Sequence, residues 1–310
     1  MARLDPSVQR LAVAFSGGPD STALLHLTLK WAAADGVPVP ALIVDHGLRP
    51  ESGTEAELAA ARARDAGAEA LVLNWEGEKP VTGRQEAARE ARYALMTRWC
   101  ADNGVTDLLL GHHLDDQAAT VLMRLRHGSG IGGLAAMPEA GMRDGVRLLR
   151  PMLGLRKLDL TNWLTAEGLP WIEDPTNRSD VYERNRLNRL LAAEDGDAAL
   201  TARLSRLARR AARADQALAA ATETAWVRLA RSVDGRIVLD RAGWEAEPEE
   251  IRLRLIARAI EAVAGAAPRL SGLEDALAIL PRQRRINLGG ALISLGGKRL
   301  SVSREPQRGR

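Results

Sequence analysis

The chain has 310 residues, of which 46% are hydrophobic and 27% are charged, as in ordinary soluble globular proteins. Its length predicts two domains, and the sequence shows neither an apolar run long enough to span a membrane nor an N-terminal signal peptide, so we expect a cytoplasmic protein with no membrane partner. The single cysteine, Cys100, excludes an intramolecular disulfide, a zinc site built on several cysteines and a cysteine pair for redox or sulfur chemistry.

Charge is distributed unevenly along the chain. There are 43 basic and 40 acidic residues, but acidic residues predominate in 1–195 and basic residues predominate in 196–310. This asymmetry indicates a polyanionic partner, with nucleic acid the first candidate. An arginine-rich composition without any partner is the alternative.

The first part of the chain repeats one pattern, a short apolar run followed by a helical stretch. This alternation predicts parallel β-strands buried between helices. Ser52 and Glu55 predict a capping box at the start of the second helix. The predicted strands cover 11–15, 41–44, 70–73 and 107–110, and the predicted helices cover 21–34, 52–66, 84–102 and 114–126.

Polar segments follow three of these strands, at 16–21, 45–49 and 111–116. In open parallel sheets, ligands bind beyond the carboxyl ends of the strands. We therefore expect the active site where these three segments meet.

The pattern changes after residue 127. Four glycines within 128–133 predict a flexible segment, which is followed by a helix over 156–167 and a D-P-T-N loop at 174–177. The chain is predicted to be helical from about 184. Residues 286–303 alternate apolar and polar side chains, with Gly-Gly turns at 289–290 and 296–297, and predict a small β-unit.

One predicted helix of the second part carries a basic stripe. Its arginines fall within about a third of the helix circumference, and no acidic residue interrupts them. Such a stripe favours binding to nucleic acid, and a solvated helix face is the alternative. Its members are Arg203, Arg206, Arg209, Arg210 and Arg213.

The segment S-G-G-P-D-S at 16–21 lies between a predicted strand and a predicted helix. Glycines there permit close approach of the backbone to a phosphate, and the helix N-terminus presents free N–H groups to the anion. No lysine follows the glycines, so this is not a Walker A motif, and Asp20 suits Mg²⁺ as a counter-charge. The alternative is a tight turn in which Asp20 or Ser21 caps the helix.

This segment resembles the signature of the PP-loop (N-type) ATP pyrophosphatases, S-G-G-x-D-S after the first strand. Further segments resemble the tRNA(Ile)-lysidine synthetase family within that superfamily, and together they cover residues 10–190 in order. They are V-D-H-G-L-R-P at 44–50, Q-E-A-A-R-E-A-R-Y at 85–93, G-H-H-L-D-D-Q-A-A-T-V-L-M-R-L at 111–125, G-S-G-I-G-G-L-A-A-M at 128–137, R-P-M-L at 150–153, G-L-P-W-I-E-D-P-T-N at 168–177 and E-R-N-R-L at 183–187.

The resemblance implies a fold and a reaction. The fold is α/β, with a Rossmann-like parallel-sheet PP-loop ATPase domain at 1–190 and a smaller, basic, mostly helical tRNA-binding domain with a short β-unit at 191–310. The reaction is an ATP-dependent ligation, a tRNA modification. The C2 oxygen of the wobble cytidine in the isoleucine tRNA with anticodon CAU attacks the α-phosphate of ATP, and free L-lysine then displaces AMP to give lysidine. The oligomeric state is left open.

The resemblance also implies roles for individual residues. Asp20 and Asp116 are expected to be catalytic and to bind Mg²⁺. His112 and His113 are expected to pack in their loop and not to bind zinc. Residues expected to bind ATP are Ser16, Gly17, Gly18, Pro19, Asp20, Ser21, Asp45, His46 and Arg89. Residues expected to bind lysine or the tRNA substrate are Arg92, Asp115, Asp116, Arg184 and Asn185.

Two positions depart from the family pattern. Ala119 stands where the family usually has Glu, and Asn188 stands where it usually has Arg. The missing carboxylate at 119 leaves one fewer partner for the lysine ammonium. The rival functions are another PP-loop tRNA-modifying enzyme such as a thiolase, an ATP-dependent amide-forming enzyme, and a non-catalytic RNA-binding homologue. Because Cys100 is flanked by Trp99 and Ala101 in a predicted helix, we expect it to be buried, which disfavours a thiolase.

Overall fold

A computed structural model describes residues 10–173, 183–194 and 199–305. The chain divides into two compact units. Unit 1 comprises Met1–His127 and Ala136–Ala208, and unit 2 comprises Gly128–Ala135 and Arg209–Arg310. The assignment of two domains with a boundary at 190 stays a prediction.

Unit 1 is built on a six-stranded sheet in the order β3-β2-β1-β4-β6-β5, parallel except for β5. The four predicted strands are confirmed. Most apolar residues of the strands at 11–14, 41–45 and 107–109 are buried because helices cover both faces of the sheet, whereas those of the edge strand at 70–74 are half-buried. The strands are β1 (Leu11–Ala14), β2 (Ala41–Asp45), β3 (Ala70–Asn74), β4 (Asp107–Leu109), β5 (Ala140–Arg143) and β6 (Val146–Leu149).

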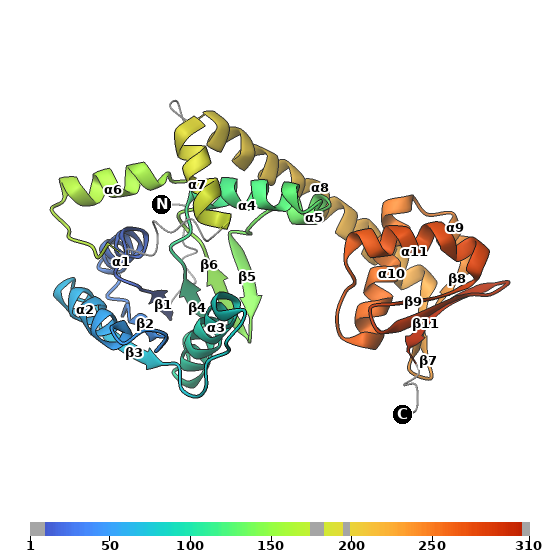
Figure 1. Ribbon diagram of the computed structural model, residues 1–310, viewed down its shortest axis with the longest axis horizontal. Coiled ribbons are helices and arrows are strands. Elements are labelled where there is room, and N and C mark those ends of the chain that lie inside the picture. Colours follow the sequence, from blue (N-terminus) through green and yellow to red (C-terminus); the bar gives the residue numbers. More distant parts are fainter. Residues whose placement is uncertain (1–9, 174–182, 195–198, 306–310) are drawn as a thin grey trace. The chain divides into compact units, whose positions relative to one another are not determined.

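The helices of unit 1 lie on both sides of this sheet (Figure 1). One core cluster joins the sheet to α1, α2 and α6, and a second joins it to α3, where Cys100 is fully buried. The helices are α1 (Pro19–Ala32), α2 (Ser52–Asp65), α3 (Arg84–Asp102), α4 (Leu114–Arg126), α6 (Lys157–Ala166) and α7 (Glu183–Glu194).

The β5–β6 hairpin extends the sheet beyond what the sequence analysis predicted. Its turn is Asp144-Gly145, with φ of 49° and 79°, the positive values that a tight hairpin turn requires. An Asp-Gly pair between short apolar segments is a hairpin signal, so this element could have been predicted.

Two local predictions were wrong. The residue before α2 is Glu51, and Ser52 does not cap the helix; its Oγ instead accepts a hydrogen bond from Arg49 N at 3.3 Å. The segment 128–133, predicted to be flexible, includes part of a short helix, α5 (Ile131–Leu134).

Unit 2 contains a five-stranded sheet in the order β7-β8-β11-β10-β9, in which all neighbours are antiparallel. The predicted β-unit at 286–303 covers only part of this sheet, because two further strands, β7 and β8, come from residues 230–240, before α10 and α11. Alternate residues such as Ile293 and Val302 are buried against α10. The elements are α8 (Ala199–Leu229), which begins in unit 1, β7 (Ala230–Val233), β8 (Arg236–Asp240), α9 (Arg241–Glu245), α10 (Glu249–Ala264), α11 (Leu270–Gln283), β9 (Arg285–Leu288), β10 (Ala291–Leu295) and β11 (Arg299–Arg304).

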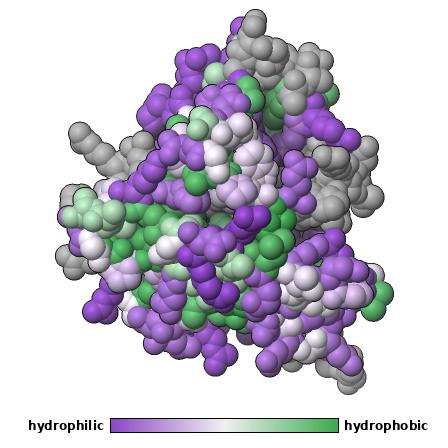
Figure 2. Space-filling view, turned by 90° about the vertical axis from the view of Figure 1, so that its left-hand side faces the viewer, coloured by the Kyte–Doolittle hydropathy of each residue, from purple (hydrophilic) through white to green (hydrophobic). Residues whose placement is uncertain are grey.

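Hydrophobic residues gather in a band on one face of the molecule (Figure 2). In unit 1, half-buried members of the core include Trp31 on α1 and Trp163 on α6, and Lys30 lies over the Trp163 ring at 5.1 Å while pairing with Glu167 at 2.7 Å. Within the described ranges, no helix is both long and apolar enough to cross a membrane.

Candidate active site at the carboxyl ends of the strands

The loop between β1 and α1 is held by its own side chains. Ser21 Oγ donates to Gly18 O at 3.0 Å and accepts from Ser16 N at 3.2 Å, while Thr22 Oγ1 donates to Gly17 O at 3.1 Å. Pro19 begins the helix, where its missing N–H costs no hydrogen bond. The loop is therefore preformed, with the N-terminus of α1 available to an anion.

Two glycines permit close packing around this loop. A Cβ on Gly17, whose φ is +78°, would lie 2.5 Å from Ile172 Cδ1. A Cβ on Gly111, directly after the end of β4, would lie 3.3 Å from the carbonyl atoms of Asp20. The backbone between β4 and α4 thus contacts the start of α1.

Asp45 is the last residue of β2, and His46 follows it. Asp45 Oδ1 accepts a hydrogen bond from Gly47 N at 2.8 Å, which orders this turn. His46 packs edge-on to Trp75, with ring centroids 6.2 Å apart. Burial, together with the charge of Arg92, lowers the pKa of His46, so the ring is neutral at pH 7.

His113 lies among three carboxylates. Its Nε2 lies 3.6 Å from Asp20 Oδ2 and 3.4 Å from Asp116 Oδ2, and its Nδ1 lies 3.4 Å from Asp115 Oδ2. Burial lowers the pKa of His113, but its interactions with the three carboxylates outweigh burial and raise it to about 9. A protonated imidazole therefore holds the acidic side chains together, a larger role than the loop packing we predicted.

Helix α6 also reaches this cluster. Lys157 Nζ lies 3.6 Å from Asp20 Oδ2, and Lys157 N donates to Asp115 Oδ2 at 2.8 Å. Burial raises the pKa of Asp20, but the interactions with His113 and Lys157 outweigh it and lower the pKa. A lysine thus lies near the PP-loop although the loop itself contains none.

A cleft of about 540 Å³ opens at the carboxyl ends of β1, β2 and β4. The structure brings ten of the predicted residues to its walls: Ser16, Gly18, Pro19, Asp20, Ser21, Asp45, His46, Arg89, Arg92 and Asp116. Gly17 belongs to the loop but does not line the cleft, and neither does Asp115, which lies on α4 and accepts a hydrogen bond from Lys157 N at the start of α6. The side chains of Arg184 and Asn185 lie outside the described residues, as does the 174–177 loop.

None of the five predicted tRNA-binding arginines is among the residues that line the cleft. All five are exposed on α8, whose opposite face buries Leu204, Ala208 and Ala211. The sequence pattern therefore gave the correct solvent-facing side of the helix.

Several residues of the cleft region were missed by the sequence analysis. Tyr93 lines the cleft and was noticed only as part of a motif, while Lys157, far along the chain, lies close to Asp20. Ile172 was missed too, although its backbone N donates to Gly17 O at 2.8 Å.

The two departures from the family pattern fall on helices that contact each other, α4 and α7. Ala119 is 1% exposed, in an apolar cluster that includes Leu187 and Leu191. Asn188 lies on α7 and is half-buried. An alanine therefore packs well at position 119.

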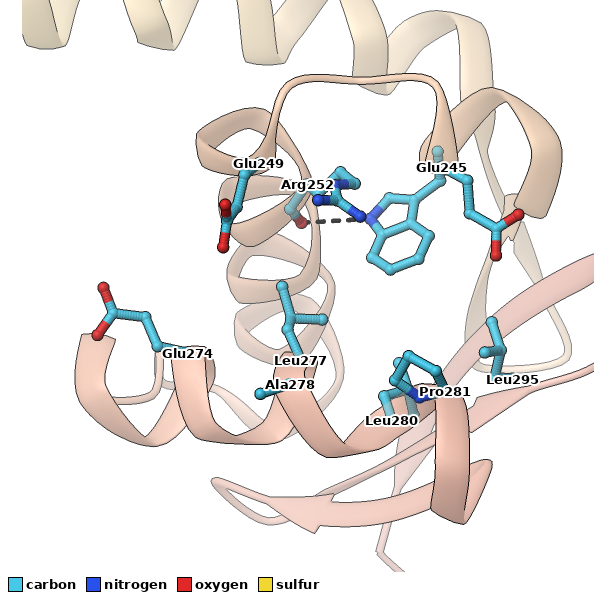
Figure 3. A pocket seen from close by; sticks show the side chains of 10 residues that line it. Glu245, Glu249, Arg252, Glu274, Leu277, Ala278, Leu280, Pro281 and Leu295 are labelled. Carbon is cyan, nitrogen blue, oxygen red and sulfur yellow. Dashed lines mark hydrogen bonds between the residues drawn. The ribbon is translucent and has the colours of Figure 1, made fainter.

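A second, smaller cavity of about 160 Å³ lies in unit 2 between α9, α10 and α11 (Figure 3). Trp244 Nε1 donates to Arg252 O at 3.3 Å across its upper wall, and Glu245, Glu249 and Glu274 lie around it. It has no PP-loop or other phosphate-binding backbone, so we assign the chemistry to the cleft in unit 1.

Comparison with known proteins identifies the family. The model of the PP-loop domain family matches residues 2–194. Relatives named tRNA(Ile)-lysidine synthase from Methylobacterium sp. strain 4-46 and Methylobacterium nodulans are 45% and 44% identical, covering 97% and 96% of this chain and 90% and 91% of their own lengths. One from Ruegeria pomeroyi is 40% identical over 96% of this chain and 71% of its own.

A solved structure supports the fold alone. The U34-tRNA thiolase NcsA from Methanococcus maripaludis, with its 4Fe–4S cluster, is similar with a TM-score of 0.58 and 17% identity, over 67% of this chain and 74% of that chain. The predicted α/β fold is therefore confirmed. From the matching PP-loop model and the relatives that span nearly the whole sequence, the chain belongs to the tRNA(Ile)-lysidine synthase family.

Proposed function

We propose that this protein ligates free L-lysine to C2 of the wobble cytidine of the isoleucine tRNA with anticodon CAU, consuming ATP and giving lysidine, AMP and pyrophosphate. The observation that carries the proposal is the cleft of unit 1, where a PP-loop and the Asp116 carboxylate face one space. The names of the relatives, tRNA(Ile)-lysidine synthase, support it. Because tRNA, ATP and lysine meet in the cytoplasm, the reaction takes place there.

The first step joins tRNA and nucleotide. The cytidine O2 attacks the α-phosphorus of ATP, a new P–O bond forms, and the bond to pyrophosphate breaks. The backbone of 16–21 and the N-terminus of α1 bind the departing phosphates, and Ser16 and Ser21 fix the shape of that loop. Asp45 and His46 border the adenosine.

The second step releases AMP. The ε-amine of lysine attacks C2, the C2–O bond breaks, and the amine loses its protons. Asp116 faces the cleft and is suited to hold the lysine ammonium and to accept a proton from the amine as it attacks. His113, protonated and buried, lies 3.4 Å from Asp116 Oδ2 and holds this carboxylate in place.

The residues fit a bound Mg²⁺. Asp20 Oδ1 is buried and has no hydrogen-bond partner among the described residues, so one oxygen of this carboxylate is available to a cation. In the described part of the chain, no three His, Cys, Asp or Glu side chains form a metal site by themselves. We propose that Asp20 and Asp116 hold Mg²⁺ together with phosphate oxygens, which would neutralise charge on the pyrophosphate.

The experiment for the reaction uses a transcript of the tRNA with anticodon CAU and radiolabelled lysine. We expect ATP-dependent incorporation of label, and release of AMP that lysine stimulates more than other amines do. A transcript with uridine at the wobble position is the control and should incorporate none. Lysine-independent AMP release, or binding of tRNA without any AMP release, would exclude the proposal in favour of another PP-loop enzyme or a non-catalytic homologue.

The role of Asp20 has its own test. We expect Asp20→Ala to abolish turnover and to remove the Mg²⁺ dependence of ATP binding, measured by titration calorimetry with and without Mg²⁺. If Asp20→Ala retained that Mg²⁺ dependence, the cation would be held elsewhere.

We further propose that the exposed arginines of α8 bind tRNA phosphates. The test variant replaces three of them by alanine: Arg206, Arg209 and Arg213. The control variant removes the same charge from exposed arginines of α2 and α3: Arg62, Arg64 and Arg98. We expect the test variant alone to raise the KM for tRNA and to flatten its salt dependence while ATP binding is unchanged. If the test and control variants had equal KM values for tRNA, the α8 arginines would be solvent-exposed residues without a role in tRNA binding.

A further inference from the structure

Tyr93 on α3 is surrounded by guanidinium groups. The Cζ atoms of Arg89, Arg92 and Arg143 lie 5.2, 5.6 and 4.6 Å from the centre of its ring. Each guanidinium group is attracted electrostatically to the negative face of the tyrosine ring, but the three positive charges repel one another. Such a cluster is best stabilised by an anion.

Two buried polar atoms in this place point to a ligand. Tyr93 is 3% exposed, and its Oη has no hydrogen-bond partner among the described residues. Arg150, which directly follows β6, is 9% exposed, and its Nε likewise has no partner there, although its Nη1 donates to Pro138 O at 2.9 Å. The Arg150 guanidinium lies close enough to the Tyr93 hydroxyl to interact with it, but neither Tyr93 Oη nor Arg150 Nε makes a hydrogen bond of good geometry among the described residues. Both atoms are therefore suited to donate to a bound group.

Two carboxylates lie near the cluster, and both contact Arg143. Arg143 pairs with Glu90, and its Nε lies 3.6 Å from Asp144 Oδ2. Burial lowers the pKa of Arg150, and the charge of Arg89 lowers it further, whereas Tyr93 raises it. An anion beside Tyr93 would relieve the repulsion between Arg89 and Arg150.

This place differs from the PP-loop. Arg150 follows β6, which lies two strands from β1 in the sheet, so the loop after β1 is about 10 Å away at the usual strand spacing. Yet Arg89, Arg92 and Tyr93 line the same cleft as the PP-loop. A group bound at Tyr93 therefore lies beside the ATP phosphates and not among them.

We propose that Tyr93, Arg92, Arg143 and Arg150 bind a phosphate of the tRNA backbone, next to the nucleotide that is modified, while Arg89 keeps the ATP-binding role expected from the sequence. The phosphate oxygens accept hydrogen bonds from Tyr93 Oη and Arg150 Nε, and the arginines supply the charge. This Tyr93 site positions the wobble base relative to ATP. It rests on the proposed function, since that function supplies the tRNA.

The decisive variant is Tyr93→Phe, which keeps the ring and removes only Oη. Because Oη has no partner among the described residues, we expect an unchanged or higher melting temperature. Loss of a hydrogen bond to a charged phosphate should weaken binding of the CAU transcript by about tenfold, measured by fluorescence anisotropy without ATP or lysine. ATP affinity, measured by calorimetry, should not change.

A second variant should act in the opposite direction. Glu90→Gln removes the carboxylate that pairs with Arg143, so we expect the transcript to bind a few-fold more tightly. The control is Arg98→Ala, which removes a charge from α3 where the side chain is 84% exposed and remote from the Tyr93 ring. We expect it to leave tRNA affinity unchanged.

The outcomes separate this inference from the proposed function. Binding of the transcript to Tyr93→Phe within twofold of the wild type would overturn the site, and a loss of ATP affinity instead would assign the phosphate to ATP and overturn the tRNA assignment. A lower melting temperature with unchanged binding would make Tyr93 purely structural. Failure of the wild type to incorporate lysine would contradict the proposed function and would leave these binding measurements interpretable.

Discussion

Replacing Gly17 by alanine tests how tightly the PP-loop is packed. At its φ of +78°, alanine costs about 1–2 kcal/mol in backbone strain. The new Cβ would also lie 2.5 Å from Ile172 Cδ1, and overpacking of this kind typically costs about 1–3 kcal/mol. We therefore expect Gly17→Ala to lower the free energy of unfolding by about 2–5 kcal/mol.

A matched control separates the two contributions. Gly67, after α2, has a φ of +92°, and no described atom lies within 4 Å of a Cβ built there. Gly67→Ala should therefore cost only the backbone strain, about 1–2 kcal/mol. Urea denaturation followed by circular dichroism gives both free energies, and equal slopes would show that the unfolded states are comparable.

Shortening the opposing side chain should relieve the contact. Ile172→Val removes Cδ1 and leaves Cγ1, 3.2 Å from the Cβ position. Alone it should cost about 0.5–1.5 kcal/mol, but combined with Gly17→Ala the total should fall well short of the sum. The reasoning is refuted if Gly17→Ala and Gly67→Ala destabilise equally, or if the Gly17 and Ile172 substitutions are additive.

Three further predictions concern buried groups. Burial raises the pKa of Cys100 to about 11, so its thiol should not react with Ellman's reagent at pH 8 in the folded protein and should react fully in urea; reaction in the folded state would contradict its burial. Asp107 is 1% exposed and pairs with Arg147, whose side chain is 35% exposed, so Asp107→Ala should cost about 1.5–3 kcal/mol in urea denaturation, and a cost below about 0.5 kcal/mol would show that the pair is not formed. Ala119→Glu would bury a carboxylate in an apolar cluster and should cost on the order of 3 kcal/mol; a stable variant with a lower KM for lysine would instead place this position in the lysine site.

The sequence was sufficient for the parts of the fold that depend on local pattern. The strands of the parallel sheet are short apolar runs, and the PP-loop lies between one of them and a helix, so both were predictable from neighbours along the chain. The convergence of Asp20, Asp45 and Asp116 followed from the rule that ligands bind at the carboxyl ends of parallel strands.

Contacts between distant segments were not predictable in this way. Lys157 lies near Asp20 because α6 begins beside the loop after β4, and neither spacing nor composition encodes that approach. The protonation of His113 likewise depends on three carboxylates from two segments and on burial. The sequence shows a histidine close to two aspartates and so indicates a charged loop. Only the structure shows that the imidazole contacts both carboxylates.

The burial of the lone cysteine has a practical consequence for measuring how the protein moves. Cys100 lies inside unit 1, fully covered, so the natural chain already serves as an unreactive background for thiol-specific probes. Cysteines introduced at Gly154 in unit 1 and Gly297 in unit 2 would carry a pair of fluorescent or spin labels without prior removal of a native thiol. The distance between those labels, followed as tRNA is added, would report directly on the arrangement of the two units during binding.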